Sequence, residues 1–140
     1  MLSFTTNSEK ETVDTAKDLV YNGVIGIGDV IKLYGELGAG KTAFVRGICA
    51  GLGVQESDIH SPTFTIINEY FSESGVSVNH FDAYRITEKD WYDNGFDEYI
   101  NENSVCLIEW SENIPKDIAG LKVDILGSGD EPREIMIEAS

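Results

Sequence analysis

The sequence predicts an α/β fold of three layers, with a mainly parallel central sheet and antiparallel strands at its flanks. Three observations predict this class. Segments of helical periodicity alternate with short apolar strands along the chain. Residues 105–108 form a continuous apolar run, which is typical of a strand covered on both faces. A glycine-rich turn follows the apolar run at 30–34 and precedes a helical pattern, which is the order strand, turn, helix.

The individual elements are separated by clear turn and cap signals. Ser8 followed by Glu11 is a capping box, and it begins the first predicted helix. The predicted elements are a helix over about 9–22, a strand at 30–34, a helix over about 41–52, a hairpin of strands 64–71 and 76–81, a helical segment over 88–103 broken at Asn94-Gly95, a strand at 105–108, and late strands at 122–126 and 134–137. No repeat or linker divides them, so we expect residues 1–140 to form one domain.

The charge of the chain argues against two classes of partner. Its 140 residues include 25 Asp and Glu but only 10 Lys and Arg, which gives a formal net charge of −15. Such a field repels phosphate backbones and anionic lipid, so we expect neither a general nucleic-acid binder nor a protein held on a membrane. Residues 1–85 carry 6 basic and 11 acidic side chains, against 4 and 14 in residues 86–140. An anionic ligand is therefore expected to bind through the first half.

The compartment is expected to be the cytoplasm. The first residues carry no secretory signal pattern, and no apolar run approaches the ~18–20 residues of a membrane span. Cys49 and Cys106 each lie in an apolar segment, where we expect buried free thiols in a reducing environment.

The glycine-rich turn has the spacing of a phosphate-binding loop, GxxxxGK[ST]. Its residues are Gly35-Glu36-Leu37-Gly38-Ala39-Gly40-Lys41-Thr42. The glycines let backbone N–H groups curl inward at the positive end of the next helix, which forms an anion nest. Lys41 would reach the β- and γ-phosphates, and the Thr42 hydroxyl would ligate the bridging magnesium. A lysine at this turn in so acidic a chain favours a bound anion over a plain turn.

Two acidic residues end predicted strands and are candidates for the metal site. Glu109 follows the apolar run 105–108, and Asp82 follows the strand at 76–81. In a phosphate-loop protein one such acid organises magnesium and the other can orient the attacking water. The alternatives are an ordinary strand-end acid for Glu109 and a turn cap for Asp82.

With these features assembled, the chain resembles the TsaE family of bacterial P-loop ATPases, which act with TsaB and TsaD in making threonylcarbamoyladenosine on tRNA. The segments that carry the resemblance are the phosphate loop, Ser61-Pro62-Thr63-Phe64-Thr65, Asn68-Glu69-Tyr70, His80-Phe81-Asp82-Ala83-Tyr84-Arg85, Gly95-Phe96-Asp97-Glu98-Tyr99 and Ile108-Glu109-Trp110. They extend over nearly the whole chain, and the second, fourth and last of them in this order are highly specific to the family.

The resemblance implies a P-loop NTPase-like fold that binds ATP and Mg²⁺. The implied cofactor-binding residues are Gly35, Glu36, Leu37, Gly38, Ala39, Gly40, Lys41 and Thr42, with Thr12 and Arg133 at the adenine. The implied metal ligands are Thr42 and Glu109, and the implied catalytic residues are Lys41, Asp82, Glu109 and Thr63. Thr63 belongs to a switch-like loop that could sense the γ-phosphate or magnesium, with a plain strand entry as the alternative. His80 is expected to be structural and not a base, and Trp110 either packs or docks a partner.

The implied function is Mg-ATP hydrolysis that regulates or resets a complex making N6-threonylcarbamoyladenosine at tRNA position 37. TsaD and TsaB homologues are the implied partners, and the acidic surface indicates that they, not this chain, touch the tRNA. Hydrolysis is expected to be slow until the chain docks on its partner.

Three other functions have weaker support. A small-molecule kinase usually clamps phosphates with several lid arginines, whereas only Arg46, Arg85 and Arg133 occur. A GTPase would need a guanine-reading N-K-x-D segment, which the sequence lacks. A non-catalytic scaffold would not need the phosphate-loop lysine and threonine together with both strand-end acids.

Overall fold

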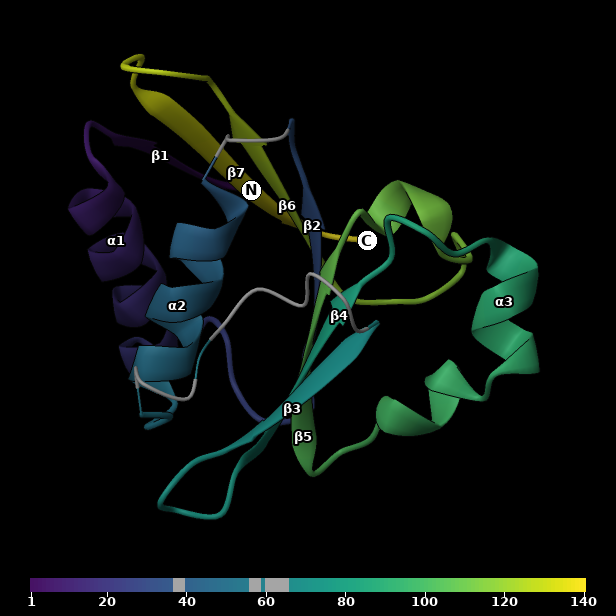
Figure 1. Cartoon of the computed structure of the whole chain (residues 1–140). Helices are drawn as coiled ribbons and strands as arrows, with labels where there is room; N and C mark the ends of the chain where they lie inside the picture. The colour runs from purple at the N-terminus through teal and green to yellow at the C-terminus, as the bar shows by residue number, and fades with distance from the viewer. Residues whose placement is uncertain (37–39, 56–58, 60–65) are drawn as a thin grey trace.

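One mixed sheet of seven strands forms the centre of the described structure (Figure 1), in the order β1-β7-β6-β2-β5-β4-β3. The computed structural model describes residues 1–36, 40–55, 59 and 66–140. Its strands are β1 (Leu2–Thr6), β2 (Val30–Tyr34), β3 (Ile67–Phe71), β4 (Ser77–Asp82), β5 (Ser104–Glu109), β6 (Leu121–Leu126) and β7 (Arg133–Ala139). The neighbours β6, β2, β5 and β4 run parallel, whereas β3, β7 and β1 pair antiparallel. The parallel centre and antiparallel flanks therefore agree with the prediction.

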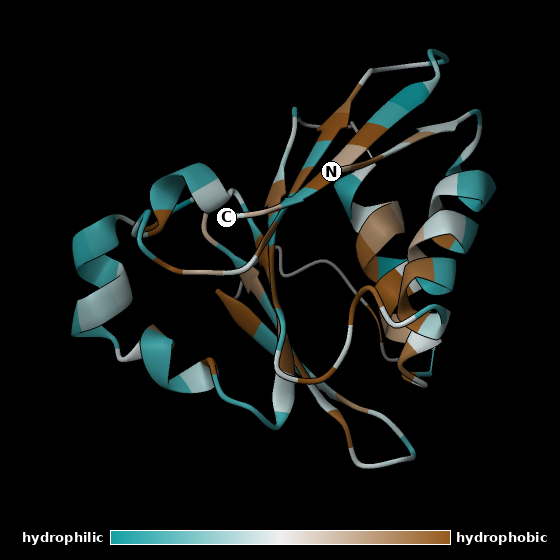
Figure 2. Ribbon diagram, turned by 180° about the vertical axis from the view of Figure 1, so that it is seen from behind, coloured by the Kyte–Doolittle hydropathy of each residue, from teal (hydrophilic) through white to brown (hydrophobic). Residues whose placement is uncertain are grey.

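Helical segments cover both faces of this sheet (Figure 1). The helices α1 (Glu9–Tyr21) and α2 (Lys41–Gly51) lie on one face, and α3 (Glu88–Asp93) with the 3₁₀ turns η2 (Phe96–Tyr99) and η3 (Ser111–Asn113) lies on the other. Phe44, Ile48 and Leu107 belong to the core under α1 and α2. Phe81 and Trp91 belong to a second core on the opposite face. Figure 2 shows hydrophobic residues gathered along the central strands and on α2.

The two helices on the first face pack closely because glycine stands at their contact. A Cβ added at Gly47 of α2 would lie 2.3 Å from the Val13 carbonyl oxygen and 2.6 Å from the Ala16 Cβ of α1. Ser8 caps α1 as predicted, since its hydroxyl accepts the Glu11 N–H at 3.1 Å. This packing holds the first turns of both helices at one end of the sheet.

Three details differ from the sequence prediction. The strand β1 was not predicted. The hairpin strand predicted from residue 64 begins at Ile67 among the described residues, and residues 64–65 lie outside them. The helical segment predicted over 88–103 is wrong at its end, because the chain after η2 is extended at Ile100 and the Asn101 side chain accepts the Asn103 N–H at 2.9 Å. Such local side-chain bonds compete with helix.

The break predicted at Asn94-Gly95 is confirmed, since Asn94 ends α3 and Gly95 has a φ of 68°. None of the described helices combines the length and the apolar character that crossing a lipid bilayer requires.

Candidate functional site

A cleft of about 880 Å³ lies where the first turns of α1 and α2 meet the carboxyl ends of β4 and β5. This volume is within the range of about 300–1,000 Å³ that ligand pockets occupy. Among the described residues its lining is Thr6, Asn7, Ser8, Glu9, Thr12, Gly40, Lys41, Thr42, Ala43, Asp82, Tyr84, Arg85, Glu109, Trp110, Gly129, Asp130, Glu131 and Arg133. The cleft therefore brings together Thr12, Gly40, Lys41, Thr42, Asp82, Glu109 and Arg133, which the sequence separates by up to 121 positions.

The first turn of α2 presents a buried, unpaired cation to this cleft. Lys41 is 5% exposed, and its Nζ has no hydrogen-bond partner among the described residues. Burying an ammonium without an acceptor is costly, so an anion at this point would stabilise it. Gly40, the residue before the helix, has a φ of 106°, which a side chain would strain. The left-handed turn at Gly40, the N-terminus of α2 and the Lys41 ammonium without a hydrogen-bond partner together suit a bound phosphate.

The rest of the predicted phosphate loop is described only in part. Gly35 and Glu36 follow β2 and do not line the cleft. Leu37, Gly38, Ala39 and Thr63 lie outside the described residues. Thr42 is half-buried on the first turn of α2.

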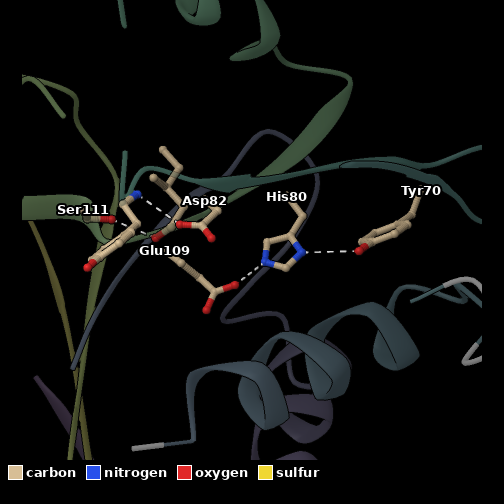
Figure 3. A network of polar contacts seen from close by, with 7 residues as sticks. Tyr70, His80, Asp82, Glu109 and Ser111 are labelled. Atoms are coloured by element: carbon tan, nitrogen blue, oxygen red, sulfur yellow. Dashed lines mark hydrogen bonds and ion pairs between the residues drawn. The ribbon is translucent and has the colours of Figure 1, made fainter. Parts of the chain in front are cut away.

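Trp110 covers the lysine from the side of β5. Its ring centroid lies 3.9 Å from the Lys41 Nζ and 4.9 Å from the Tyr84 ring centroid. The backbone of Trp110 is left-handed, with a φ of 59°, which is unfavourable for a bulky residue. The turn is held by Ser111, whose hydroxyl donates to the Ile108 carbonyl at 2.8 Å (Figure 3). The chain therefore bends sharply after β5 and returns an indole to the cleft.

The two predicted acids are neighbours on adjacent parallel strands. Asp82 ends β4, Glu109 ends β5, and the two are register partners. Asp82 is half-buried, and its Oδ1 accepts the Tyr84 N–H at 3.0 Å. Glu109 is buried, with 8% of its surface exposed. Both carboxylates line the cleft that Lys41 also lines.

A hydrogen-bonded histidine supports the buried carboxylate (Figure 3). The His80 Nε2 lies 2.5 Å from the Glu109 Oε2, and its Nδ1 lies 3.4 Å from the Tyr70 hydroxyl. Sequence reasoning treated His80 only as a structural residue and gave Tyr70 no role. The alternation in β4 puts His80 and Asp82 on one face, but only the strand register brings Glu109 to them.

The two residues predicted to contact adenine, Thr12 and Arg133, also line the cleft. Thr12 is buried, and its Oγ1 lies 2.7 Å from the Oγ1 of Thr6. The Arg133 guanidinium donates to the Gly129 carbonyl at 3.1 Å, and its Nε lies 4.0 Å from the position of a Cβ added at Gly40. Arg133 thus lies beside Gly40, the residue that precedes α2.

The charge of the lining is mixed. Among the described residues, five carboxylates line the cleft against three cationic side chains, these being Glu9, Asp82, Glu109, Asp130 and Glu131 against Lys41, Arg85 and Arg133. The described residues contain no group of three or more His, Cys, Asp or Glu arranged to hold a metal. Magnesium at nucleotide sites is bound by one or two protein groups together with phosphate oxygens and water, so the pair Thr42 and Glu109 suits that chemistry.

Comparison with known proteins points in one direction. The family model described as "Threonylcarbamoyl adenosine biosynthesis protein TsaE" matches residues 6–135. The chain is 43% identical over 114 residues to the tRNA threonylcarbamoyladenosine biosynthesis protein TsaE of Bacillus subtilis (strain 168), a match that covers 80% of this chain and 70% of that protein. The protein of the same name from Treponema pallidum (strain Nichols) is 39% identical over 114 residues, or 80% and 82% of the two chains. The crystal structure of Bacillus subtilis YdiB aligns with a TM-score of 0.71 and 36% identity, over 99% of this chain and 84% of that one.

Proposed function

Because the chain belongs to the TsaE family of tRNA threonylcarbamoyladenosine biosynthesis, we propose that it is the subunit of that system that binds and hydrolyses Mg-ATP. Its fold is then of the P-loop NTPase type, and the cleft at the start of α2 is the nucleotide site. Turnover of ATP regulates or resets a cytoplasmic complex with TsaD and TsaB homologues, in which the partners contact position 37 of the tRNA.

The observation that carries this proposal is the Lys41 ammonium. It is buried and has no hydrogen-bond partner among the described residues, although it lies at a helix N-terminus in an open cleft. A lysine serving only the fold would be exposed or bonded to a carbonyl. The β- and γ-phosphates of ATP supply the acceptors that this group lacks.

The charge of the cleft supports the proposal that magnesium accompanies the nucleotide. ATP carries several negative charges, and the described lining already holds more carboxylates than cations. Magnesium, when bound, neutralises charge on the β- and γ-phosphate oxygens and so assists their separation. In this proposal Thr42 and Glu109 ligate it, and Gly40 with the first turn of α2 supplies backbone N–H groups to the phosphates.

The remaining residues complete the reaction. Asp82, beside Glu109 at the strand ends, orients the attacking water or supports the metal. Thr63 senses the γ-phosphate or magnesium, and Thr12 and Arg133 contact the nucleoside end. With its charge of −15 the chain leaves contact with tRNA to its partners.

Calorimetric titration of ATP, with and without MgCl₂, into the wild-type chain and Lys41→Ala tests the proposal first. We expect the wild-type chain to bind ATP in a magnesium-dependent way and Lys41→Ala to lose this binding. GTP should compete poorly with ATP for the wild-type chain. An ATPase assay of the chain alone, and of the chain with TsaB and TsaD homologues, follows, and we expect faster turnover in the assembly. No binding of adenine nucleotides in any of these mixtures, or fast turnover that TsaD does not change, would overturn the proposal.

A further inference from the structure

The strand register places three polar side chains on one face of the sheet. In the parallel pair of β4 and β5, His80 is opposite Leu107 and Asp82 is opposite Glu109. Leu107 belongs to the core under α1 and α2, so His80, Asp82 and Glu109 face the same side as α2 (Figure 3). His80, at 1% exposure, is thus buried on this face two residues before Asp82, which lines the cleft with Glu109.

The two hydrogen-bond partners of His80 determine which of its ring nitrogens carries the proton. An ionised carboxylate can only accept hydrogen bonds, so the Nε2 that lies 2.5 Å from the Glu109 Oε2 carries a proton. In the neutral ring the Nδ1 is then an acceptor, and the Tyr70 hydroxyl donates to it at 3.4 Å. Tyr70 reaches it from the antiparallel neighbour β3, where it pairs with Val78, two residues before His80.

From this geometry we propose that His80 is a positioning residue, which holds the Glu109 carboxylate in the orientation that binds the magnesium of Mg-ATP, and that Tyr70 selects the tautomer of the His80 ring. The proposal rests on the function proposed above. A glutamate has three side-chain torsions, and the bond at Oε2 restricts them, so that Oε1 is the oxygen left to bind a ligand in the cleft that Glu109 lines. Groups that orient a ligating carboxylate change metal affinity by about 10- to 100-fold when they are removed.

A histidine that served only to fill the core would give a different result from a positioning one. The matched control is Asn79, the preceding residue of β4, which is buried at 3% and faces the other side of the sheet. Its side chain donates to the Tyr99 carbonyl at 3.1 Å. Asn79→Ala therefore removes a buried polar contact from the same strand without touching Glu109.

The experiment compares the magnesium requirement of wild-type protein, His80→Ala, His80→Gln, Tyr70→Phe and Asn79→Ala. The readout is the Mg²⁺ concentration that half-saturates binding of a non-hydrolysable ATP analogue, with the affinity for the analogue in EDTA measured beside it. We expect His80→Ala to raise that concentration by about 10- to 100-fold while the affinity in EDTA stays within about twofold. His80→Gln keeps an N–H near the Nε2 position and should restore most of the loss. Tyr70→Phe should raise the half-saturating Mg²⁺ concentration a few-fold. Asn79→Ala should lower the stability of the protein and leave that concentration unchanged.

A second readout needs no nucleotide. The ¹⁵N shifts of the His80 ring in the ligand-free protein, assigned by their loss in His80→Gln, report which nitrogen holds the proton. We expect a protonated Nε2 in wild-type protein and a mixture of tautomers in Tyr70→Phe.

The outcomes separate the two proposals. A wild-type chain that binds no Mg-ATP overturns the proposed function and this inference with it. A wild-type chain with a clear magnesium requirement that His80→Ala leaves unchanged, or that Asn79→Ala raises equally, overturns the inference alone. So does an unprotonated Nε2 in the ligand-free protein, which decides the question even if His80→Ala does not fold.

Discussion

The Lys41 ammonium lies 3.9 Å from the centroid of the Trp110 ring, and this cation–π contact is the interaction that the described structure gives it in place of a hydrogen bond. Such a contact contributes about 0.5–2 kcal/mol. Removing an ammonium from water costs several kcal/mol in a protein interior. We therefore expect the lysine to lower the stability of the ligand-free protein, as is common in binding sites.

Replacing Lys41 should separate ligand binding from stability. We expect Lys41→Met to weaken ATP binding by at least about tenfold, because charged hydrogen bonds contribute about 1.5–3 kcal/mol. The free energy of unfolding in urea should stay the same or rise, since the unpaired ammonium is gone.

The control for this prediction is Lys32→Met. Lys32 is also 5% exposed, but its Nζ donates to the Ile118 carbonyl at 2.7 Å, and burial lowers its pKa. This change should destabilise the protein by about 1–3 kcal/mol and leave ATP binding intact. Equal destabilisation by both changes would contradict the interpretation of Lys41.

The charge of Asp82 should matter for hydrolysis more than for binding. Asp82→Asn retains an oxygen that can accept the Tyr84 N–H, so the turn after β4 is expected to persist. We expect the affinity for ATP to change by no more than a few-fold and hydrolysis to fall by about 10²-fold or more. Single-turnover hydrolysis beside calorimetric binding measures both. Asp124→Asn on β6, outside the cleft lining, is the control, and normal turnover of Asp82→Asn would refute the assigned role.

Helix packing gives a prediction about stability. Gly47→Ala places a methyl group 2.3 Å from the Val13 carbonyl oxygen, so α1 and α2 must move apart. We expect a loss of about 1–3 kcal/mol in the free energy of urea unfolding. In the control, Gly26→Ala, the added Cβ meets nothing within 4 Å, and the change should have little effect. Similar losses in the two variants would show that the helix contact can adapt.

The buried thiols predict a fall in stability at alkaline pH. Burial raises the pKa of Cys49 from 9.0 to about 12 and that of Cys106 to about 11. Above pH 9 the unfolded chain loses these protons while the folded chain keeps them, so unfolding becomes more favourable as the pH rises. Between its pKa in the unfolded chain and its pKa in the folded chain, each thiol lowers the free energy of unfolding by about 1.4 kcal/mol per pH unit.

Urea unfolding under reducing conditions at pH 8 and pH 10.5 tests this effect. The Cys49→Ala variant should lose less stability over that interval than wild-type protein, because it lacks the group with the larger pKa shift. Equal losses would mean that Cys49 does not contribute to the pH dependence.

Local patterns predicted most of the fold. The strand β2, the helix α2 and the break at Gly95 follow from apolar runs, helical spacing and glycine, all of which act over a few residues. The strand β1 was missed because it is only five residues long and mostly exposed, and because its partner β7 is about 130 residues away in the sequence. Pairing over such a distance leaves little local pattern.

Some features of the candidate site follow from local patterns in the sequence, and others depend on the tertiary fold. The spacing of the phosphate loop and the strand-end positions of Asp82 and Glu109 are local, and they sufficed to name residues that line one cleft. The contact of His80 with Glu109 depends on which strands are neighbours and in what register, so it could not be predicted from the sequence. The indole of Trp110 over Lys41 depends on a backbone conformation that is unusual for tryptophan.

The pairing of β1 with β7 also bears on biosynthesis. During translation the first strand leaves the ribosome long before the last one, which is its neighbour at the edge of the sheet. The wall that bears Thr6 and Arg133 thus awaits the synthesis of β7, and a nascent chain without this strand would have an open, incomplete cleft. Competence for ligand binding would consequently arise only after synthesis has passed this strand, so a ribosome stalled before it would hold a chain without the finished pocket.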